Sequence, residues 1–250
     1  MAATGLSSCG LSRKIGRKQF DAGMHLCKIL PGERGAGIVA TETTTRERIA
    51  WDEPNAVQMR VVLEGIEPAI WRRLVVPIET TLAQLHHILQ AAMGWTDSHL
   101  HQFEIGGLRF GDPELLNQDM PDDFQQAFDA APVRLRDFHF DHEGTLSFVY
   151  TYDFGDSWRH TVTLEKLLAA KPEPKTATRI EGARCCPPED VGGAHGYFEF
   201  VRVLLSPDPD EIEEQKHLKR WSGGRFNPER FDVTKTDKAV RGALRKQRRE

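Results

Sequence analysis

The sequence VQMRVVLEGIEPAIWRRLVV at residues 57–76 consists of two apolar stretches joined by a short polar segment. The first stretch has apolar residues at every second position, namely Val57, Met59, Val61 and Leu63. A period of two is typical of a strand with one buried face. Residues 65–68 contain Gly and Pro and predict a turn, and residues 70–76 predict a second strand that Pro77 ends. We therefore predict an antiparallel hairpin.

The next segment predicts a helix. Thr81 and Gln84 have the spacing of a capping box, in which each side chain bonds to the backbone N–H of the other residue. Apolar residues follow at helical spacing, namely Leu82, Leu85, Ile88, Leu89, Ala92 and Met93. Gly94 suits the C-terminal cap. His86 and His87 lie on this helix, and we interpret both as solvated or capping histidines.

Two further stretches predict a second hairpin, with strands at residues 145–152 and 157–167. Alternate positions place Leu146, Phe148, Tyr150 and Tyr152 on one face of the first strand, and Trp158, His160, Val162 and Leu164 on one face of the second. Residues 153–157 contain Asp, Gly and Ser, which favour a turn. Residues 100–105 and 108–110 predict two short strands.

The remaining segments predict mostly helices and surface loops. Residues 111–131 are acidic and predict a surface excursion with one short helix, and residues 171–178 form a linker rich in Pro and Lys. Helices are predicted at residues 194–205 and 209–221, and a basic helix at residues 234–249 is expected to fray. Because strands and helices do not alternate strictly, the pattern favours an α+β fold over a doubly wound sheet.

We predict a single α+β domain in which two antiparallel hairpins form a mixed sheet. One long helix in the N-terminal half packs on this sheet, and the C-terminal portion is helical. Residues 51–234 form the domain, residues 1–50 are a disordered or mis-annotated extension, and residues 235–250 are a basic helical tail.

The net charge of −4 is unevenly distributed among these three parts. Lys and Arg number 8 against 4 Asp and Glu in residues 1–50, and 7 against 2 in residues 235–250, which leaves 18 against 31 in between. Because affinity for nucleic acid rises with the number of Lys and Arg contacts to phosphate, we expect any nucleic acid to bind at the two ends. The alternative is that the asymmetry only aids solubility.

Composition excludes several classes of protein. No apolar stretch approaches the roughly 20 residues of a membrane-spanning helix, so we predict no membrane insertion. The four cysteines do not form a disulfide framework, and no signal peptide is evident, so we expect a cytoplasmic protein. The sequence contains no nucleophile elbow, Walker motif or zinc-protease helix.

The first candidate functional motif is GWTDSHLHQF at residues 94–103. His99 and His101 are two positions apart, so on a strand their side chains point the same way. Imidazole binds zinc, copper, iron or nickel, and Asp97 is near enough in sequence to join them. The alternative is that these residues hydrogen-bond to the backbone at a helix-to-strand junction, with Trp95 in the core.

The second candidate motif is YDFGDSWRH at residues 152–160, which contains Asp153, Asp156, Trp158 and His160. Two carboxylates followed by a histidine could bind a metal or act as a general acid–base pair. The alternative is that the aspartates accept backbone hydrogen bonds in a hairpin turn.

The third candidate motif is GARCCPPEDVGG at residues 182–193. It contains Cys185, Cys186, Glu189 and Asp190. Adjacent cysteines lack the roughly two to four intervening residues of a zinc knuckle, so they could bind a metal only together with histidines such as His99 or His101. The alternatives are a structural loop, a substrate contact and a redox role.

Seven motifs occur in a fixed order along the chain. They are PAIWRRL at 68–74, LAQLH at 82–86, MGWTDSHLH at 93–101, YDFGDSW at 152–158, CPPED at 186–190, GG at 192–193 ahead of GY at 196–197, and FNPERFD at 226–232. Together they resemble the plasmid pRiA4b ORF-3-like family, over roughly residues 54–245.

The resemblance implies an α+β domain, a bacterial cytosolic setting and an association with plasmids or mobile elements, without an established reaction. Many members of the family carry a second cysteine where this chain has Val191. A metal site on the cysteine pair would therefore be incomplete unless Cys185 substitutes.

Two functions are compatible with these observations. The favoured hypothesis is a non-catalytic binding or accessory domain in plasmid or mobile-element biology, with a protein partner or with DNA bound through the basic ends. Candidate DNA contacts are Arg241, Arg245, Lys246, Arg248 and Arg249.

The alternative is a metal-dependent hydrolase or nucleic-acid-processing enzyme. No cofactor is established by the motifs, and a divalent metal ion is compatible with this alternative. The enzyme requires convergence of His99 or His101, Asp153 or Asp156, His160, Glu189 and Asp190 in one cleft.

Overall fold

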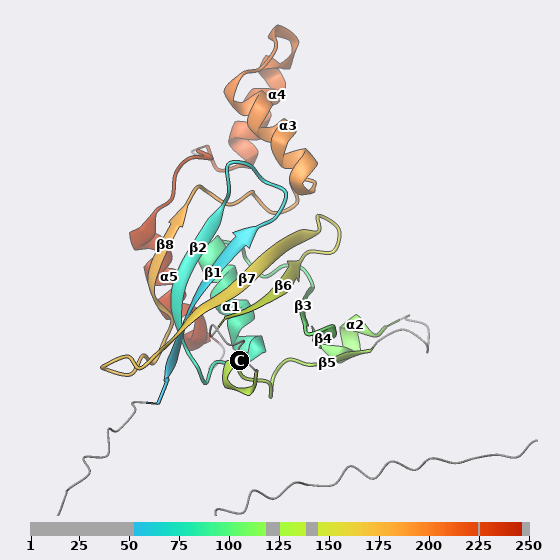
Figure 1. Cartoon of the computed structure of the whole chain (residues 1–250). Coiled ribbons are helices and arrows are strands. Elements are labelled where there is room, and N and C mark those ends of the chain that lie inside the picture. The colour runs from blue at the N-terminus through green and yellow to red at the C-terminus, as the bar shows by residue number, and fades with distance from the viewer. Residues whose placement is uncertain (1–52, 119–125, 139–144, 225, 247–250) are drawn as a thin grey trace, which may run out of the picture. The chain divides into compact units, whose positions relative to one another are not determined.

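A mixed sheet of eight strands is the framework of the fold (Figure 1). The computed structural model describes residues 53–118, 126–138, 145–224 and 226–246, so the predicted extension at residues 1–50 lies outside the described residues. The strands are β1 (Ala56–Leu63), β2 (Trp71–Pro77), β3 (His101–Ile105), β4 (Leu108–Gly111), β5 (Ala127–Asp129), β6 (Leu146–Tyr152), β7 (Trp158–Leu168) and β8 (Thr178–Ala183).

The strand order is β5-β4-β3-β6-β7-β1-β2-β8. Neighbouring strands are antiparallel, except that β4 and β5 are parallel. The predicted α+β class is confirmed, and the sheet is larger than the two predicted hairpins.

The two predicted hairpins, β1–β2 and β6–β7, form the centre of the sheet because β1 also pairs with β7. The alternation predicted for β1 is present, since Val57, Met59, Val61 and Leu63 are all buried. In the second hairpin, Tyr150, Tyr152 and Trp158 are buried as well. These aromatic side chains lie close to the candidate site.

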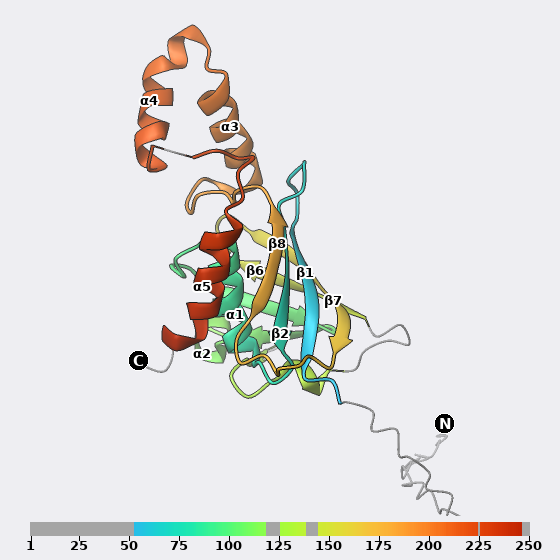
Figure 2. The same cartoon turned by 90° about the vertical axis from the view of Figure 1, so that its left-hand side faces the viewer.

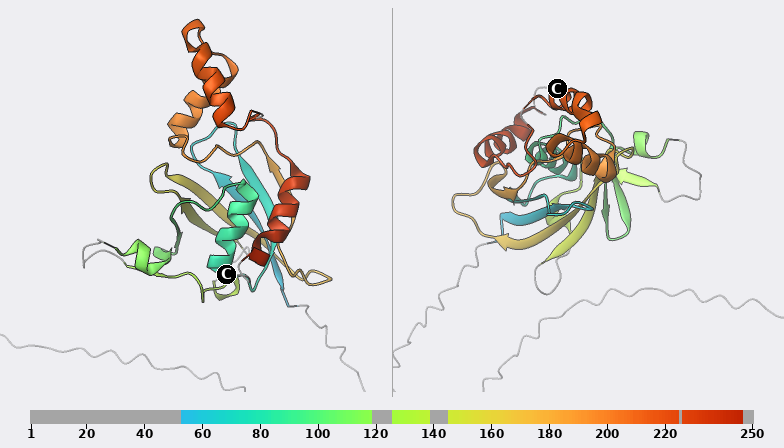
Figure 3. Two further views of the ribbon diagram at one scale, coloured as in Figure 1. Left: turned by 180° about the vertical axis from the view of Figure 1, so that it is seen from behind. Right: turned by 90° about the horizontal axis from the view of Figure 1, so that it is seen from above.

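Helix α1 (Leu82–Met93) and helix α5 (Val233–Lys246) lie side by side over one face of the sheet (Figures 2 and 3). The Oγ1 of Thr81 accepts a hydrogen bond from the N–H of Gln84 at 3.2 Å, and Oε1 of Gln84 accepts one from the N–H of Thr81 at 3.1 Å. In α5, Val240 is fully buried against the core. The predicted helix is present over its described part, and its apolar side packs against α1 and β8. The expected fraying of its end stays a prediction.

Helices α3 (Gly193–Leu205) and α4 (Ile212–Trp221) lie beside each other beyond one end of the sheet (Figure 1). The 3-10 helix η2 (Pro209–Glu211) joins them. Phe200 of α3 packs against the ring of Trp221 of α4 at 5.7 Å between centroids. Two short helical segments, α2 (Pro113–Leu116) and η1 (Leu135–Asp137), complete the described secondary structure.

The edge strands β5 and β8 have no counterpart among the predicted elements. Strand β8 begins at Thr178, where the predicted linker ends, and pairs with β2. A Cβ at Gly182 would lie 2.6 Å from the backbone oxygen of Trp71, so only glycine permits this close approach. Strand β8 therefore forms through its pairing with β2 and not through a strong alternation of its own.

Candidate metal centre

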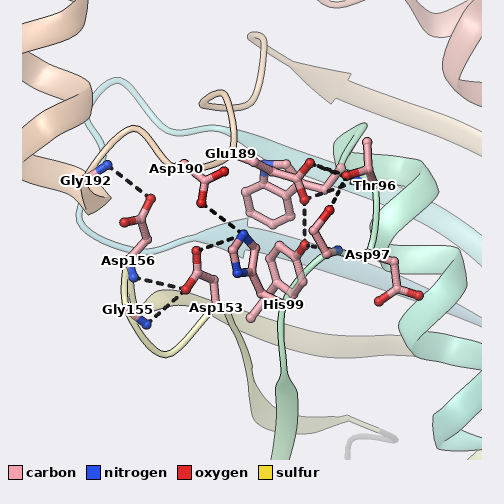
Figure 4. Close-up of polar contacts among 12 residues, drawn as sticks. Thr96, Asp97, His99, Asp153, Gly155, Asp156, Glu189, Asp190 and Gly192 are labelled. Carbon is pink, nitrogen blue, oxygen red and sulfur yellow. Dashed lines mark hydrogen bonds and ion pairs between the residues drawn. The ribbon is translucent and has the colours of Figure 1, made fainter.

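Three segments that are far apart in the sequence meet at one site (Figure 4). They are residues 95–99 after α1, the turn at residues 153–157 between β6 and β7, and residues 184–192 before α3. Each segment belongs to one of the three candidate motifs, so the structure brings parts of all three motifs together.

His99 lies between two carboxylates at the centre of this site (Figure 4). Its Nε2 is 3.1 Å from Oδ1 of Asp190 and 3.6 Å from Oδ2 of Asp153. This nitrogen is shielded from solvent, and it has hydrogen-bond geometry with no described residue. The donor atoms of the three side chains all lie within 4.8 Å of one another, a spacing at which they could hold a metal ion.

Asp153 is fixed by the hairpin turn that carries it. Its Oδ1 accepts hydrogen bonds from the backbone N–H groups of Gly155 at 2.9 Å and Asp156 at 3.3 Å. The side chain is almost fully buried and has little freedom to rotate, so its Oδ2 stays directed toward His99.

Glu189 holds the loop of Asp190 against the loop of His99. Its Oε1 accepts a hydrogen bond from the Tyr152 hydroxyl at 2.5 Å, and its Oε2 accepts one from Oγ1 of Thr96 at 2.5 Å. The indole N–H of Trp95 donates to the backbone oxygen of Pro187 at 3.0 Å. Burial and the Glu189 carboxylate raise the pKa of Tyr152, which keeps its hydroxyl a donor. Glu189 therefore positions the site and is not one of the three close donors.

Asp156 fixes the other end of the same loop. Its Oδ2 accepts a hydrogen bond from the backbone N–H of Gly192 at 3.1 Å. A Cβ at Gly193 would lie 2.7 Å from the backbone oxygen of Asp156, and Gly193 has a φ of 67°. Glycine is therefore required where this loop approaches the β6–β7 turn.

A second group of donors lies on α1 and the loop that follows it. Oδ1 of Asp97 is 2.6 Å from Nε2 of His86, and Oδ2 is 3.2 Å from Nδ1 of His87. The hydrogen bonds from the two histidines lower the pKa of Asp97, whereas burial lowers the pKa of His86. His101 stacks on His86 with ring centroids 3.4 Å apart, and burial lowers its pKa to about 3.

The two histidines of this second group were not among the predicted site residues. The expectation of a solvated or capping side chain is wrong for His86, which is only 2% exposed. His86 is four residues after Leu82 and three before Leu89, so the helical period already places it on the buried side of α1. His87 is half-buried.

Four other candidate residues do not reach either group of donors. Trp158 and His160 lie in the core, where Trp158 stacks on Trp95 at 6.0 Å and Nδ1 of His160 is 3.2 Å from the backbone oxygen of Tyr150. Burial lowers the pKa of His160 to about 4. Neither Cys185 nor Cys186 belongs to a metal-binding group within the described ranges, and burial raises the pKa of Cys186 to about 12. The predicted combination of these cysteines with His99 or His101 does not form.

The proposed DNA contacts at the C-terminus are described only in part. Arg241 is exposed and forms an ion pair with Asp237 at 2.6 Å. The side chains of Arg245 and Lys246 are not described, and Arg248 and Arg249 lie outside the described residues. Their role stays a prediction.

Comparison with known proteins identifies the family to which the chain belongs. The profile of the family described as "Plasmid pRiA4b ORF-3-like protein" matches residues 55–235, which include both groups of donors. The chain belongs to this family. It is 37% identical over 169 residues to the Uncharacterized protein y4hQ of Sinorhizobium fredii, a match that covers 68% of this chain and 81% of that relative.

One solved structure has a fold similar to that of this chain. The crystal structure of the protein of unknown function MM3350 from Methanosarcina mazei Go1 is 35% identical, with a TM-score of 0.62. The likeness covers 73% of this chain and 97% of that chain. Among the described helices, none is both long enough and apolar enough to cross a membrane.

Proposed function

We propose that this domain binds a divalent metal ion between His99, Asp153 and Asp190 and uses it to hydrolyse a substrate. The observation that carries the proposal is the position of Nε2 of His99, which is buried between two carboxylates without a hydrogen bond to either. A cation bound between Nε2 of His99 and the carboxylates of Asp153 and Asp190 would satisfy all three donors at once.

The donor set favours a transition metal. One imidazole nitrogen and two carboxylate oxygens suit zinc, manganese or iron. Three protein ligands leave coordination positions for water and substrate. An ion bound in this way lowers the pKa of its water and polarises a carbonyl or phosphoryl group, which is the chemistry of hydrolysis.

The surroundings of Asp190 support access to the site. Its side chain is 72% exposed, so the ion would face solvent on that side. Asp190 also lines a cavity of about 500 Å³ between α3 and α4, together with Phe200 and Trp221. We assign this cavity to the substrate, because it borders Asp190, a proposed ligand.

Metal analysis and hydrolysis assays test the proposal. The full-length chain is equilibrated with Zn²⁺ or Mn²⁺, desalted and analysed for metal, and then assayed with p-nitrophenyl acetate, p-nitrophenyl phosphate and bis-p-nitrophenyl phosphate. We expect His99→Ala and Asp153→Asn to lose one bound ion and the activity together. The matched control is His195→Ala, an exposed histidine on α3. Unchanged metal content in both site variants would refute the proposal.

The second candidate function is a non-catalytic accessory domain in plasmid or mobile-element biology. The charge distribution favours it, because both basic ends flank a body with 18 Lys and Arg against 31 Asp and Glu. Its test is a gel shift at increasing salt, with Gln replacing Arg13, Lys14, Arg17, Lys18, Arg248 and Arg249. Substitution is preferable to deletion of residues 235–250, since deletion would remove Val240 from the core. A shift that survives all six substitutions would contradict binding through these six side chains.

A further inference from the structure

We propose a second metal site, formed by His86, His87 and Asp97. Its three ligands differ from those of the proposed hydrolytic site, and it does not depend on that function. The donor atoms of these three side chains lie within 4.8 Å of one another. Two imidazoles and one carboxylate are the donor set of many iron and zinc centres.

The distances between the donors are close to those around a metal ion. Nε2 of His86 and Nδ1 of His87 lie 2.6 Å and 3.2 Å from the two oxygens of Asp97. Bonds of about 2.0–2.1 Å from an ion to each donor, at tetrahedral angles, place neighbouring ligand atoms roughly 3.3 Å apart. The 3.2 Å pair already has this separation, and the hydrogen-bonded 2.6 Å pair would have to lengthen. The three side chains therefore need little movement to surround an ion.

The local fold explains why neighbouring histidines meet one carboxylate. His86 and His87 are consecutive on α1, so their side chains leave the helix in different directions. Gly94 ends the helix with a φ of 95°, and the chain then returns so that Asp97 reaches both rings. The backbone N–H of Asp97 donates to Oε1 of Gln90 at 3.1 Å, which fixes the returning loop on the helix.

Tyr150 provides the outer support that a metal-bound histidine requires. Its hydroxyl lies 2.8 Å from Nδ1 of His86, on the side of the ring away from Asp97, and it accepts a hydrogen bond from Nε2 of Gln90 at 3.0 Å. A histidine ligand commonly donates its second N–H to such a partner, which fixes the orientation of the ring.

One hydrogen-bond arrangement satisfies these groups without an ion. In it, the Tyr150 hydroxyl donates to Nδ1 of His86, and Nε2 of His86 donates to Asp97. Binding of an ion at Nε2 would move the His86 proton to Nδ1, with the Tyr150 oxygen as its acceptor. His87 would likewise bind through Nδ1 and carry its proton on Nε2. The proposed site thus predicts a change of tautomer in His86.

A cavity of about 250 Å³ gives access to this site. It is lined by the three proposed ligands, by His99 of the first site, and by Leu100, Leu115 and Leu116. Three protein ligands on its wall leave coordination positions open to the cavity, so the bound ion could take a small ligand as well as water. The leucines make part of the wall apolar, which suits a small ligand with one metal-binding group.

Metal stoichiometry of the full-length chain tests this site separately from the first. We expect wild type to retain two Zn²⁺ ions, His87→Ala and His99→Ala one each, and the double variant none. His195→Ala is again the control, and circular dichroism confirms that each variant is folded. His87 is half-buried, so its replacement avoids the disruption that a change at buried His86 could cause.

Each outcome assigns or removes one site. If only His99→Ala loses metal, the second site is refuted while the first stands, and if neither variant loses metal, both sites are refuted. If only His87→Ala loses an ion, the first site fails and the second stands, and a wild type without metal refutes both. Long-range ¹H–¹⁵N spectra of His99→Ala give an independent readout, since Zn²⁺ should move the His86 proton from Nε2 to Nδ1. An unchanged tautomer would also refute the second site.

Discussion

Glu189 offers a direct test of how the candidate metal centre is held together. We consider Glu189→Gln, which keeps the shape of the side chain but removes one acceptor oxygen and the charge. The carboxylate accepts hydrogen bonds from the Tyr152 hydroxyl and from Oγ1 of Thr96, both at 2.5 Å. The backbone N–H of Thr96 also lies 3.2 Å from both oxygens.

The expected loss of stability follows from these contacts. A hydrogen bond to a charged group contributes roughly 1.5–3 kcal/mol when it is well shielded. The contact with Tyr152 is partly buried, whereas the contacts with Thr96 are exposed and contribute less. We therefore expect Glu189→Gln to lower the free energy of unfolding by about 2 kcal/mol. Because the change loosens the loop of Asp190, metal affinity at the His99 site should fall by about 10-fold.

Urea denaturation and metal competition measure the two effects. The control is Glu213→Gln, which removes an exposed ion pair with Lys216 and should change the unfolding free energy by less than about 0.5 kcal/mol. If Glu189→Gln lowers the unfolding free energy no more than the control does, the Glu189 hydrogen bonds do not stabilise the fold. If stability falls by the expected amount but metal affinity is unchanged, the Glu189 hydrogen bonds do not position Asp190.

Three further substitutions test other parts of the structure. His160→Gln should reduce the acid sensitivity of folding. The pKa of His160 is lowered to about 4 in the folded chain, so only the unfolded chain takes up this proton as the pH falls below about 6.5. Between pH 7.5 and 5, the free energy of unfolding of wild type should therefore fall by about 2 kcal/mol more than that of the variant, as measured by urea titration. Arg72→Met should lower the free energy of unfolding by about 4 kcal/mol in the same assay, because this buried side chain donates hydrogen bonds to four backbone oxygens, those of Trp71, Ala92, Ala183 and Arg184. The control, exposed Arg241→Met, should lower it by less than about 1 kcal/mol. Gly193→Ala should cost roughly 1–3 kcal/mol and weaken metal binding at His99, because the added Cβ would lie 2.7 Å from the Asp156 oxygen, and equal melting temperatures in a thermal melt would contradict this.

Local patterns predicted the centre of the fold because its elements carry their own signals. Strand β1 alternates over Val57–Leu63 in sequence and in burial, and Thr81 and Gln84 mark the first residues of α1 in both. The edge strands β5 and β8 carry weaker signals, since β5 has only three residues and β8 depends on its pairing with β2. Pairing partners more than 100 residues apart cannot be inferred from local periodicity.

The packing of α5 shows the same limit from another direction. Its basic composition led us to place residues 235–250 outside the domain as a helical tail, yet Val240 is completely buried against the core. Lys and Arg side chains on one side of a helix do not prevent the opposite side from packing. Net charge therefore indicates which partners a segment could attract, but the spacing of its apolar residues decides whether it joins the domain.

The candidate site was predicted in part because turn chemistry and metal chemistry use the same residues. For Asp153 the sequence allowed either a turn residue or a metal ligand. In the structure, one oxygen accepts the hydrogen bonds of the turn and the other faces His99. Asp97, Asp153 and Asp190 all have positive φ angles, of 64°, 56° and 60°, which aspartate tolerates better than most residues. Such a backbone position turns the chain sharply and leaves a carboxylate at the turn. The partner that this carboxylate meets, whether His99 or His86, depends on how distant segments pack, so a single sequence identifies the donors more readily than their grouping.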